Sequence, residues 1–181
     1  MANQRLTDKS ALALNPSSDD LFHIVDVSDT TGSAAGTSKK IENKFIIQTD
    51  KVAISSANFQ AMDTGGGAGT FQTLVAAPGS GFMIQPLTIS VAVDYTSGTQ
   101  SSKKVLFFGH QTADSNYTSG YIFNFMHSIT TDTFYITSPV NLRSLQTVSS
   151  ADNLPLYVFS SGNFSSTFSA DIYVTYQVVK I

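Results

Sequence analysis

The chain has 181 residues, no cysteine and a net charge of −3, so it is long enough for one full hydrophobic core but not for two large domains. The slightly acidic balance disfavours nucleic acid as a partner, because phosphate binding needs a concentrated basic surface. No apolar run approaches the roughly 18 residues of a membrane span, and the start "MANQRLTDKS" lacks the apolar core of a secretory signal. We therefore expect no membrane insertion, and we expect the chain to be made in the cytoplasm.

The distribution of charge divides the chain into two segments. Residues 1–64 carry 14 of the 23 charged side chains, whereas the remaining 117 residues carry nine. The cluster "TGGGAGT" lies at this change, and its glycines are typical of a flexible joint. It lacks the lysine that closes a phosphate-binding loop, and no helical pattern follows it. We therefore predict an arm over residues 1–64 and a domain over residues 65–181.

The arm contains one clear strand, "DLFHIVDVSD", in which residues alternate between two faces. The turn-forming residues 30–38 predict a hairpin loop, and "KKIENKFIIQ" returns as a second strand or a short helix. Two or three short elements cannot bury enough apolar surface to fold alone, so the arm needs another protein as a partner. The apolar residues that we expect to contact this partner are Leu21, Phe22, Ile24, Val25, Ile41, Phe45 and Ile46.

The arm also carries a resemblance to a known group of proteins. Its segment "DLFHIVDVSDTTGSAAGTSKKI" resembles a segment near the N-termini of tailed-bacteriophage fibre and virion-associated proteins. In that group an aspartate-rich strand, a Thr-Thr-Gly turn and a Gly-Thr-x-Lys-Lys-Ile return mark an attachment module. The resemblance covers about 22 residues, and it implies that the arm anchors the chain to another virion protein.

The second segment is a series of short strand candidates separated by Gly, Ser, Asn, Asp and Pro. About eight such strands predict an all-β fold, an antiparallel sandwich of the jelly-roll type. The candidates are "TFQTLVAA", "FMIQPLTISVAVDY", "KVLFFGH", "GYIFNFMHSI", "TFYITS", "NLRSLQTV", "LPLYVFSS" and "FSADIYVTYQVVKI". In the last of these strands we expect an inward row of Ile172, Val174, Tyr176 and Val178.

The segment "TLVAAPGSGFMIQPLTISVAVDY" predicts a hairpin whose turn is the Ala-Pro-Gly-Ser-Gly run, and Pro86 predicts a bulge or an edge. Together with the closing "LPLYVFSSGNFSSTFSADIYVTYQVV", it resembles a β-sandwich domain at the ends of phage tail fibres, head fibres and decoration proteins. In those domains a Leu-Val-x-Ala-Pro-Gly hairpin opens the domain and a Tyr-Val-Thr-Tyr strand ends it. The match lies at the two ends of residues 73–179. Phe82, Phe164 and Phe168 depart from the pattern.

The second segment has too few charges for a monomeric sandwich, whose surface is typically about a quarter charged. Some of its surface should therefore be covered by further copies of the chain. The resemblance to fibre ends implies a homotrimer around a common axis, with a larger ring or a dimer as alternatives. The expected interface residues lie in strands with apolar neighbours on both faces, and they are Phe107, Phe108, Phe123, Phe125 and Tyr135.

Catalytic patterns are weak, and we expect neither an enzyme nor a cofactor or metal site. The histidines His23, His110 and His127 are far apart and form no metal-binding pair. The run "PGSGF" lacks the spacing and the helix of a serine nucleophile elbow. Asp94 and Asp171 offer a pair of carboxylates for glycoside cleavage, but capping at strand ends explains both of them more simply.

Two functions therefore stay open at this point. The first is a structural protein of the virion, which is made in the host bacterium and contacts the host surface. The second is a carbohydrate-binding, lectin-like module of the same fold. Its candidate ligand residues are Tyr117 and Phe164, because a ring in a polar loop can stack on a sugar, including a glycan of the host surface.

Overall fold

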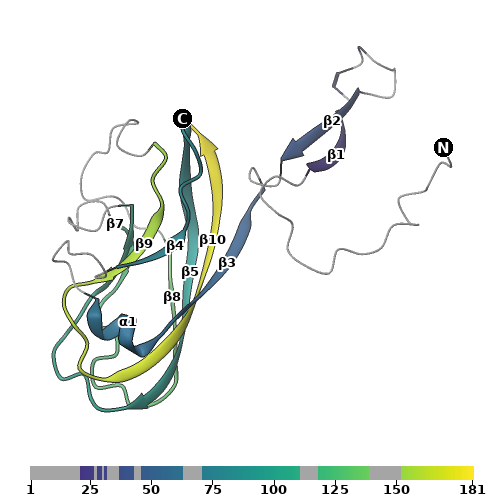
Figure 1. The fold of residues 1–181 in the computed structure, drawn as a ribbon. Coiled ribbons are helices and arrows are strands. Elements are labelled where there is room, and N and C mark those ends of the chain that lie inside the picture. Colours follow the sequence, from purple (N-terminus) through teal and green to yellow (C-terminus); the bar gives the residue numbers. More distant parts are fainter. Residues whose placement is uncertain are drawn as a thin grey trace. The chain divides into compact units, whose positions relative to one another are not determined.

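The computed structural model describes residues 21–26, 28–29, 31, 37–42, 46–62, 71–110, 118–138 and 152–181. The chain divides into two compact units, Met1–Ile46 and Ile47–Ile181, which we describe separately (Figure 1). In the described residues no helix has the length and apolar character needed to cross a membrane.

The first unit contains a two-stranded antiparallel hairpin. β1 (Leu21–Asp26) pairs with β2 (Thr37–Glu42), so that Leu21 lies opposite Glu42 and Asp26 lies opposite Thr37. The expected strand and its return are therefore confirmed. The return forms a strand rather than a short helix over the residues that pair.

The second unit consists of two four-stranded antiparallel sheets and one short helix. The first sheet has the order β3-β10-β5-β8, and the second has the order β4-β9-β6-β7. The elements are β3 (Gln48–Ile54), α1 (Ser56–Ala61), β4 (Gln72–Val75), β5 (Phe82–Ser97), β6 (Leu106–Gly109), β7 (Thr118–Ile122), β8 (Thr133–Thr137), β9 (Leu156–Ser160) and β10 (Thr167–Lys180).

The strand order identifies the sandwich as a jelly roll. Successive strands from β3 to β9 alternate between the two sheets, except that β6 and β7 are neighbours in one sheet. The last strand, β10, returns to lie between β3 and β5. Two sheets of four strands with this wound connectivity are the jelly-roll architecture. The expected all-β, jelly-roll-like sandwich is thus confirmed.

The start of the sandwich differs from the expected boundary at residue 64, because β3 and α1 belong to the second unit. β3 pairs with β10 over seven residues, from Ile54 opposite Ala170 to Gln48 opposite Tyr176. The Tyr176 hydroxyl also bonds to Gln48 Oε1 at 2.8 Å and to Asp50 Oδ2 at 2.9 Å. β3 is therefore the first strand of the jelly roll rather than part of the arm.

Helix α1 follows β3 directly and extends the core. The side chain of Ser55 caps the helix by accepting a hydrogen bond from the Asn58 amide, which satisfies an otherwise free helical donor. The one buried residue of the helix is Phe59, and Met62 just after it is also buried. The polar residues of α1 thus face outward while Phe59 enters the sandwich.

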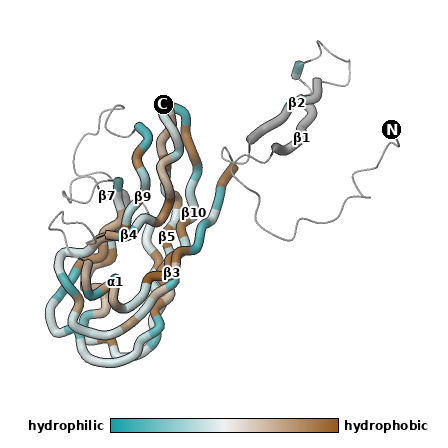
Figure 2. The backbone as a smooth tube through the Cα atoms, in the orientation of Figure 1, coloured by the Kyte–Doolittle hydropathy of each residue, from teal (hydrophilic) through white to brown (hydrophobic). Residues whose placement is uncertain are grey.

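The core fills the space between the two sheets. Along the strands hydrophobic and hydrophilic residues alternate (Figure 2), as expected for strands with one buried face. In β10 the residues Ile172, Val174 and Tyr176 are buried and Val178 packs against them, which confirms the expected inward row.

The predicted opening hairpin is wrong, because its two strands lie in different sheets. β4 pairs with β9, whereas β5 pairs with β10 and β8, so the loop between β4 and β5 crosses from one sheet to the other. Its turn is as expected, since Gly79 and Gly81 have φ values of 103° and 82° that favour glycine. Pro86 does mark a bulge, where the pairing with β10 skips Leu87.

Two further strand candidates differ from expectation or lie outside the described residues. In "GYIFNFMHSI" the strand β7 ends at Ile122. A tight turn follows, in which Asn124, Met126 and Ser128 have positive φ values of 52°, 59° and 60°. This candidate is therefore not a strand covered on two faces. The candidate "NLRSLQTV", residues 141–148, lies outside the described residues.

Candidate functional site

The hairpin of the first unit carries most of the residues that we expect in the anchor. Leu21, Phe22, Ile24 and Val25 lie on β1 and Ile41 lies on β2, opposite Phe22. Ile46 is half-buried at the end of the unit. Phe45 lies outside the described residues.

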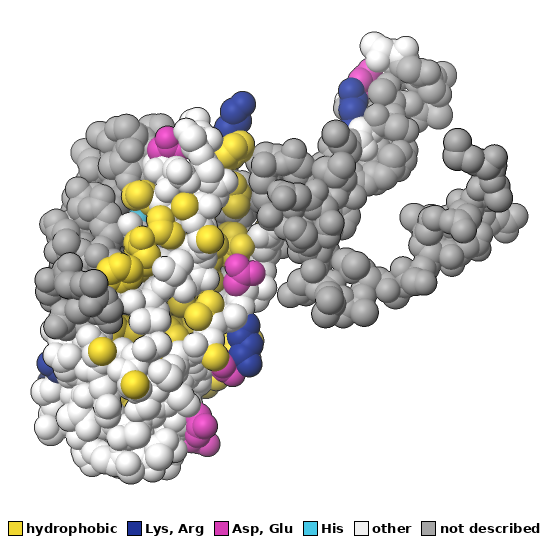
Figure 3. Space-filling view, in the orientation of Figure 1, with side chains coloured by type: hydrophobic (Ala, Val, Ile, Leu, Met, Phe, Trp, Pro, Cys, Tyr) yellow, Lys and Arg dark blue, Asp and Glu magenta, His cyan; other side chains and the backbone are white. Residues whose placement is uncertain are grey.

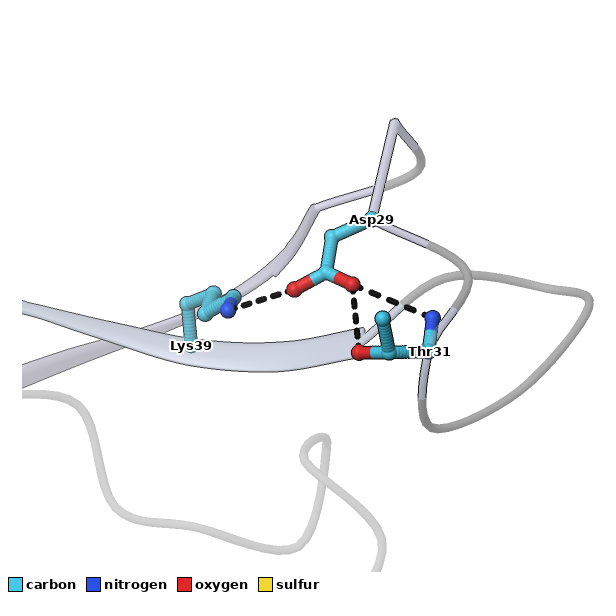
Figure 4. A network of polar contacts seen from close by, with 3 residues as sticks. All are labelled: Asp29, Thr31 and Lys39. Carbon is cyan, nitrogen blue, oxygen red and sulfur yellow. Dashed lines mark hydrogen bonds and ion pairs between the residues drawn. The ribbon is translucent and has the colours of Figure 1, made fainter.

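A polar network fixes the turn region that follows β1. The Asp29 carboxylate accepts hydrogen bonds from the Thr31 amide at 3.1 Å and from the Thr31 hydroxyl at 2.6 Å. Its other oxygen lies 2.6 Å from Lys39 Nζ on β2 (Figure 4). An aspartate that binds the backbone two residues later is typical of a turn. The Asp29 carboxylate therefore joins this turn to β2.

An aromatic surface covers the outer side of the sheet β4-β9-β6-β7. Leu106 and Phe108 of β6 are in the core, so Phe107 between them faces outward. Phe107 pairs across the strands with Phe159 on one side and with Tyr121 on the other. We call this set the outer aromatic face, and its members are Phe71, Phe107, Tyr121, Phe123, Tyr157 and Phe159.

The rings of this face lie close enough to interact. Phe107 stacks on Phe159 with ring centroids 5.3 Å apart, and Tyr121 meets Phe123 edge to face at 4.5 Å. Both arrangements are favourable for aromatic pairs. Phe123 is 59% exposed. Two of the five residues expected at an oligomer interface, Phe107 and Phe123, are therefore on an outer surface.

The other three residues expected at that interface have internal contacts. Phe108 and Phe125 are completely buried between the sheets, so they cannot contact another copy of the folded chain. Tyr135 is half-buried and packs against Phe125 at a centroid distance of 4.9 Å. Its hydroxyl accepts a hydrogen bond from the Met126 amide at 3.2 Å. The expectation for Phe108 and Phe125 is therefore corrected. Phe108 is on the inward side of β6, and β7 ends before Phe125.

The structure also corrects one of the two candidate ligand residues. Phe164 is buried, and its ring packs edge to face against Phe59, Phe125 and Phe168 at 5.4–6.0 Å. It is therefore a core residue in a polar stretch of sequence and cannot stack on a sugar. Tyr117 lies outside the described residues.

The three histidines weighed for catalysis lie on different elements. His110 is buried, and its Nδ1 lies 3.1 Å from the Pro155 carbonyl oxygen. Burial lowers the pKa of His110 below its ordinary value, and hydrogen bonds to the backbone of Pro155 and Ile84 oppose this shift. His127 lies in the turn after β7, and His23 lies on β1. His110 and His127 therefore belong to different segments of the second unit, and His23 belongs to the first unit.

Asp94 and Asp171 lie on the neighbouring strands β5 and β10, on the outer side of their sheet. Asp171 forms an ion pair with Lys51 of β3 at 2.7 Å, and this hydrogen bond raises the pKa of Lys51. In the view of Figure 3 most charged side chains lie on the side of β3 and β10. Among the described residues, no group of three or more His, Asp or Glu side chains is placed to hold a metal ion.

Sequence patterns gave no signal for one polar residue that joins three loops. Gln100 is completely buried. Its Nε2 donates to the Ser102 carbonyl at 2.8 Å, and its Oε1 accepts from the Ser165 amide at 2.7 Å. Its backbone carbonyl accepts from the Ser128 amide at 3.0 Å. Because its polar groups are paired, Gln100 stabilises this end of the sandwich.

A second network fixes the loop between β4 and β5. The Gly81 amide donates to Asp152 Oδ1 at 2.6 Å, and the Gly79 amide donates to Asn153 Oδ1 at 2.9 Å. The Asn153 amide in turn donates to the Phe82 carbonyl at 2.9 Å. Two side chains that precede β9 thus hold the turn that crosses between the sheets.

Comparisons with known proteins give several structural likenesses. No protein-family model matches this chain, and no curated protein matches it in sequence. A solved structure described as the cyanophage Pam1 capsid asymmetric unit is similar at 14% sequence identity and a TM-score of 0.41, over 97% of this chain and 98% of that chain.

Proposed function

We propose that this chain is a structural component of a phage virion, a subunit of a head fibre, capsid decoration or tail fibre. In this proposal the N-terminal arm anchors the chain to another virion protein, and the sandwich is displayed outside. The chain has no catalytic role. The proposal rests on the two sequence resemblances, which imply an anchor segment followed by a β-sandwich.

The observation that carries the anchor is the separate hairpin of the first unit. Among the described strands β1 and β2 form a two-stranded sheet of their own. An isolated two-stranded hairpin is marginally stable in water. A partner protein that covers or extends the hairpin would supply the missing buried area, as an attachment module requires. We place the anchor in residues 1–46, because β3 and α1 are part of the sandwich.

We further propose that copies of the chain associate as a homotrimer through the outer aromatic face. Phe107, Tyr121 and Phe123 are on this face and are not completely buried. Of the six residues of this face Phe123 is exposed, Phe159 is completely buried and the other four are half-buried. Aromatic side chains are enriched at interfaces. Closed rotational symmetry would cover the face in every copy without producing an open filament.

The alternative of a carbohydrate-binding module loses one of its two supports. The module depended on Tyr117 and Phe164 in exposed loops, and Phe164 is buried. None of the described residues therefore supports a glycan of the host surface as a partner.

The anchor is tested by comparing particles that contain the full chain with particles made with a chain of residues 47–181. We expect the full chain to be found on purified virions by immunogold labelling, and the shortened chain to fold but to be absent from them. Hydrogen exchange should show weak protection of β1 in the isolated chain and strong protection on the particle. Strong protection of β1 in the isolated chain, or incorporation of the shortened chain, would contradict the proposal.

A further inference from the structure

Strand β8 is an edge strand with an uncharged, apolar outer side. Among the described strands it is the last of the sheet β3-β10-β5-β8 and pairs with β5. Its sequence is Thr133-Phe134-Tyr135-Ile136-Thr137, in which alternate residues are exposed. The exposed residues are Phe134 and Ile136, at 59% and 65%. Exposed apolar side chains on an edge strand are uncommon, because such an edge readily pairs with another strand.

The opposite edge of the same sheet shows the protection that β8 lacks. β3 carries Asp50 and Lys51, and Lys51 forms the ion pair with Asp171 on β10. Charged side chains on an edge strand discourage pairing with other chains. The neighbours of Phe134 and Ile136 on β5 are Ala92 and Ser90, which are small. The side chains of Phe134 and Ile136 therefore project beyond the small neighbouring side chains of β5.

The sandwich holds β8 in a fixed position. The Asp132 carboxylate, just before the strand, accepts a hydrogen bond from the Tyr95 amide at 2.9 Å. The Thr137 hydroxyl, at its end, donates to the Tyr121 carbonyl of β7 at 3.1 Å. Between them Tyr135 packs against the buried Phe125. A strand ordered in advance loses little entropy when a second strand pairs with it.

The sequence of β8 is complementary to itself. We propose that β8 pairs with β8 of a second copy of this chain, antiparallel and around a two-fold axis at Tyr135. In this register Thr133 lies opposite Thr137 of the other copy, and Phe134 lies opposite Ile136 of the other copy, twice. Pairs of an aromatic and a β-branched residue, and pairs of threonines, are favourable across antiparallel strands. The same contact on both copies makes a closed dimer of the two sheets.

The charges beside β8 do not oppose this pairing. Asp132 would lie opposite Ser138 of the other copy rather than opposite its own equivalent. The two Asp132 residues would be about 20 Å apart along the strands, which exceeds the screening length of about 8 Å at physiological salt.

The contact involves five residues of each copy, so we expect a weak dimer by itself. It is separate from the outer aromatic face, which lies on the other sheet, and it does not depend on a role in a virion. Where copies are held close together on a common support, the high local concentration would favour the pairing.

Cysteine cross-linking tests both the pairing and its register, because the chain has no cysteine of its own. In the proposed register positions 134 and 136 of two copies have Cα atoms about 5 Å apart, within the range for a disulfide. Positions 134 and 134 would be roughly 8 Å apart, beyond that range. A mixture of full-length F134C and I136C chains with tags of different length should therefore form the mixed disulfide dimer under mild oxidation. Each variant alone should cross-link only at the level of T49C, a control at an exposed position of β3, on the opposite edge of the same sheet.

Sedimentation velocity over a range of concentrations gives a second measurement. The association step through β8 should be present in the natural chain, absent in I136K, and retained in I47K, whose position is 60% exposed outside β8. Association through the outer aromatic face should be the same in all three chains. Melting curves of the variants should match that of the natural chain, since both positions are exposed. A mixture that cross-links only as much as T49C would overturn the proposal, and this result is expected if β8 pairs with a different protein. Efficient cross-linking of F134C with itself would also overturn it, because that result requires parallel pairing or an antiparallel register centred on position 134.

Discussion

Replacing Phe59 by alanine tests whether α1 is part of the sandwich core. The Phe59 side chain is completely buried. Its ring centroid lies 4.6 Å from that of Phe168, 6.0 Å from that of Phe164 and 6.1 Å from that of Phe125. The substitution removes the ring and leaves a cavity among three other rings. For phenylalanine at such a position the free energy of unfolding falls by about 3–5 kcal/mol.

The assay is thermal unfolding of the full chain, followed by calorimetry. For a domain of this size each kcal/mol lowers Tm by about 3–4 °C, so we expect F59A to melt about 10–20 °C below the natural chain. The control is Q60A, at an exposed neighbour, because the backbone carbonyl of Gln60 rather than its side chain accepts a hydrogen bond from Asn163. This control should change stability by less than about 0.5 kcal/mol. If F59A melted like Q60A, α1 would be part of a mobile arm and the assignment of β3 and α1 to the sandwich would be wrong.

Three further predictions concern the sandwich. A chain of residues 47–181 should unfold cooperatively near the Tm of the full chain. A chain of residues 65–181 should show no cooperative transition, because it lacks β3 and α1. Equal stability of the two chains would contradict the assignment of β3 and α1 to the sandwich. Burial lowers the pKa of His110 in the folded state, so its contribution to stability is present above about pH 6.5 and is lost as the pH falls toward the lowered pKa. Chemical denaturation between pH 7 and pH 5 should therefore show a smaller loss of unfolding free energy in H110Q than in the natural chain. An equal dependence of the unfolding free energy on pH in the two chains would refute this. D152A leaves the part-buried Gly81 amide without its 2.6 Å partner and should cost about 1–3 kcal/mol in denaturant unfolding; a change within error would mean that the turn between β4 and β5 does not depend on this carboxylate.

Much of the fold class could be predicted from local patterns. Alternation in β10 identified the buried row of Ile172, Val174 and Tyr176, because neighbouring side chains on a strand point to opposite faces. Turn chemistry identified the glycines of the loop after β4, and the missing amide of Pro86 identified the bulge in β5. These features depend on a few adjacent residues, so the sequence around them is sufficient.

The candidate surfaces were predicted only in part. Phe107 and Phe123 are on an outer surface, while Phe108, Phe125 and Phe164 are in the core. A strand of aromatic residues shows which side chains alternate, but not which face meets the second sheet. The turn after Ile122, with its left-handed residues, reverses the direction in which Phe125 points, and nothing in a run of apolar letters indicates it.

Sequence by itself determined most of the strands, the turn after β4 and the all-β class, since these follow from side-chain period, glycine conformation and proline chemistry over short stretches. Only the tertiary structure decided that β3 and α1 belong to the sandwich, that the segment from β4 to β5 crosses between sheets rather than forming a hairpin, and that Gln100 joins three loops. Each of these depends on a partner far away in the sequence. β3 is stable as a strand because β10, more than 100 residues later, pairs with it, and no local pattern in residues 48–54 contains that information.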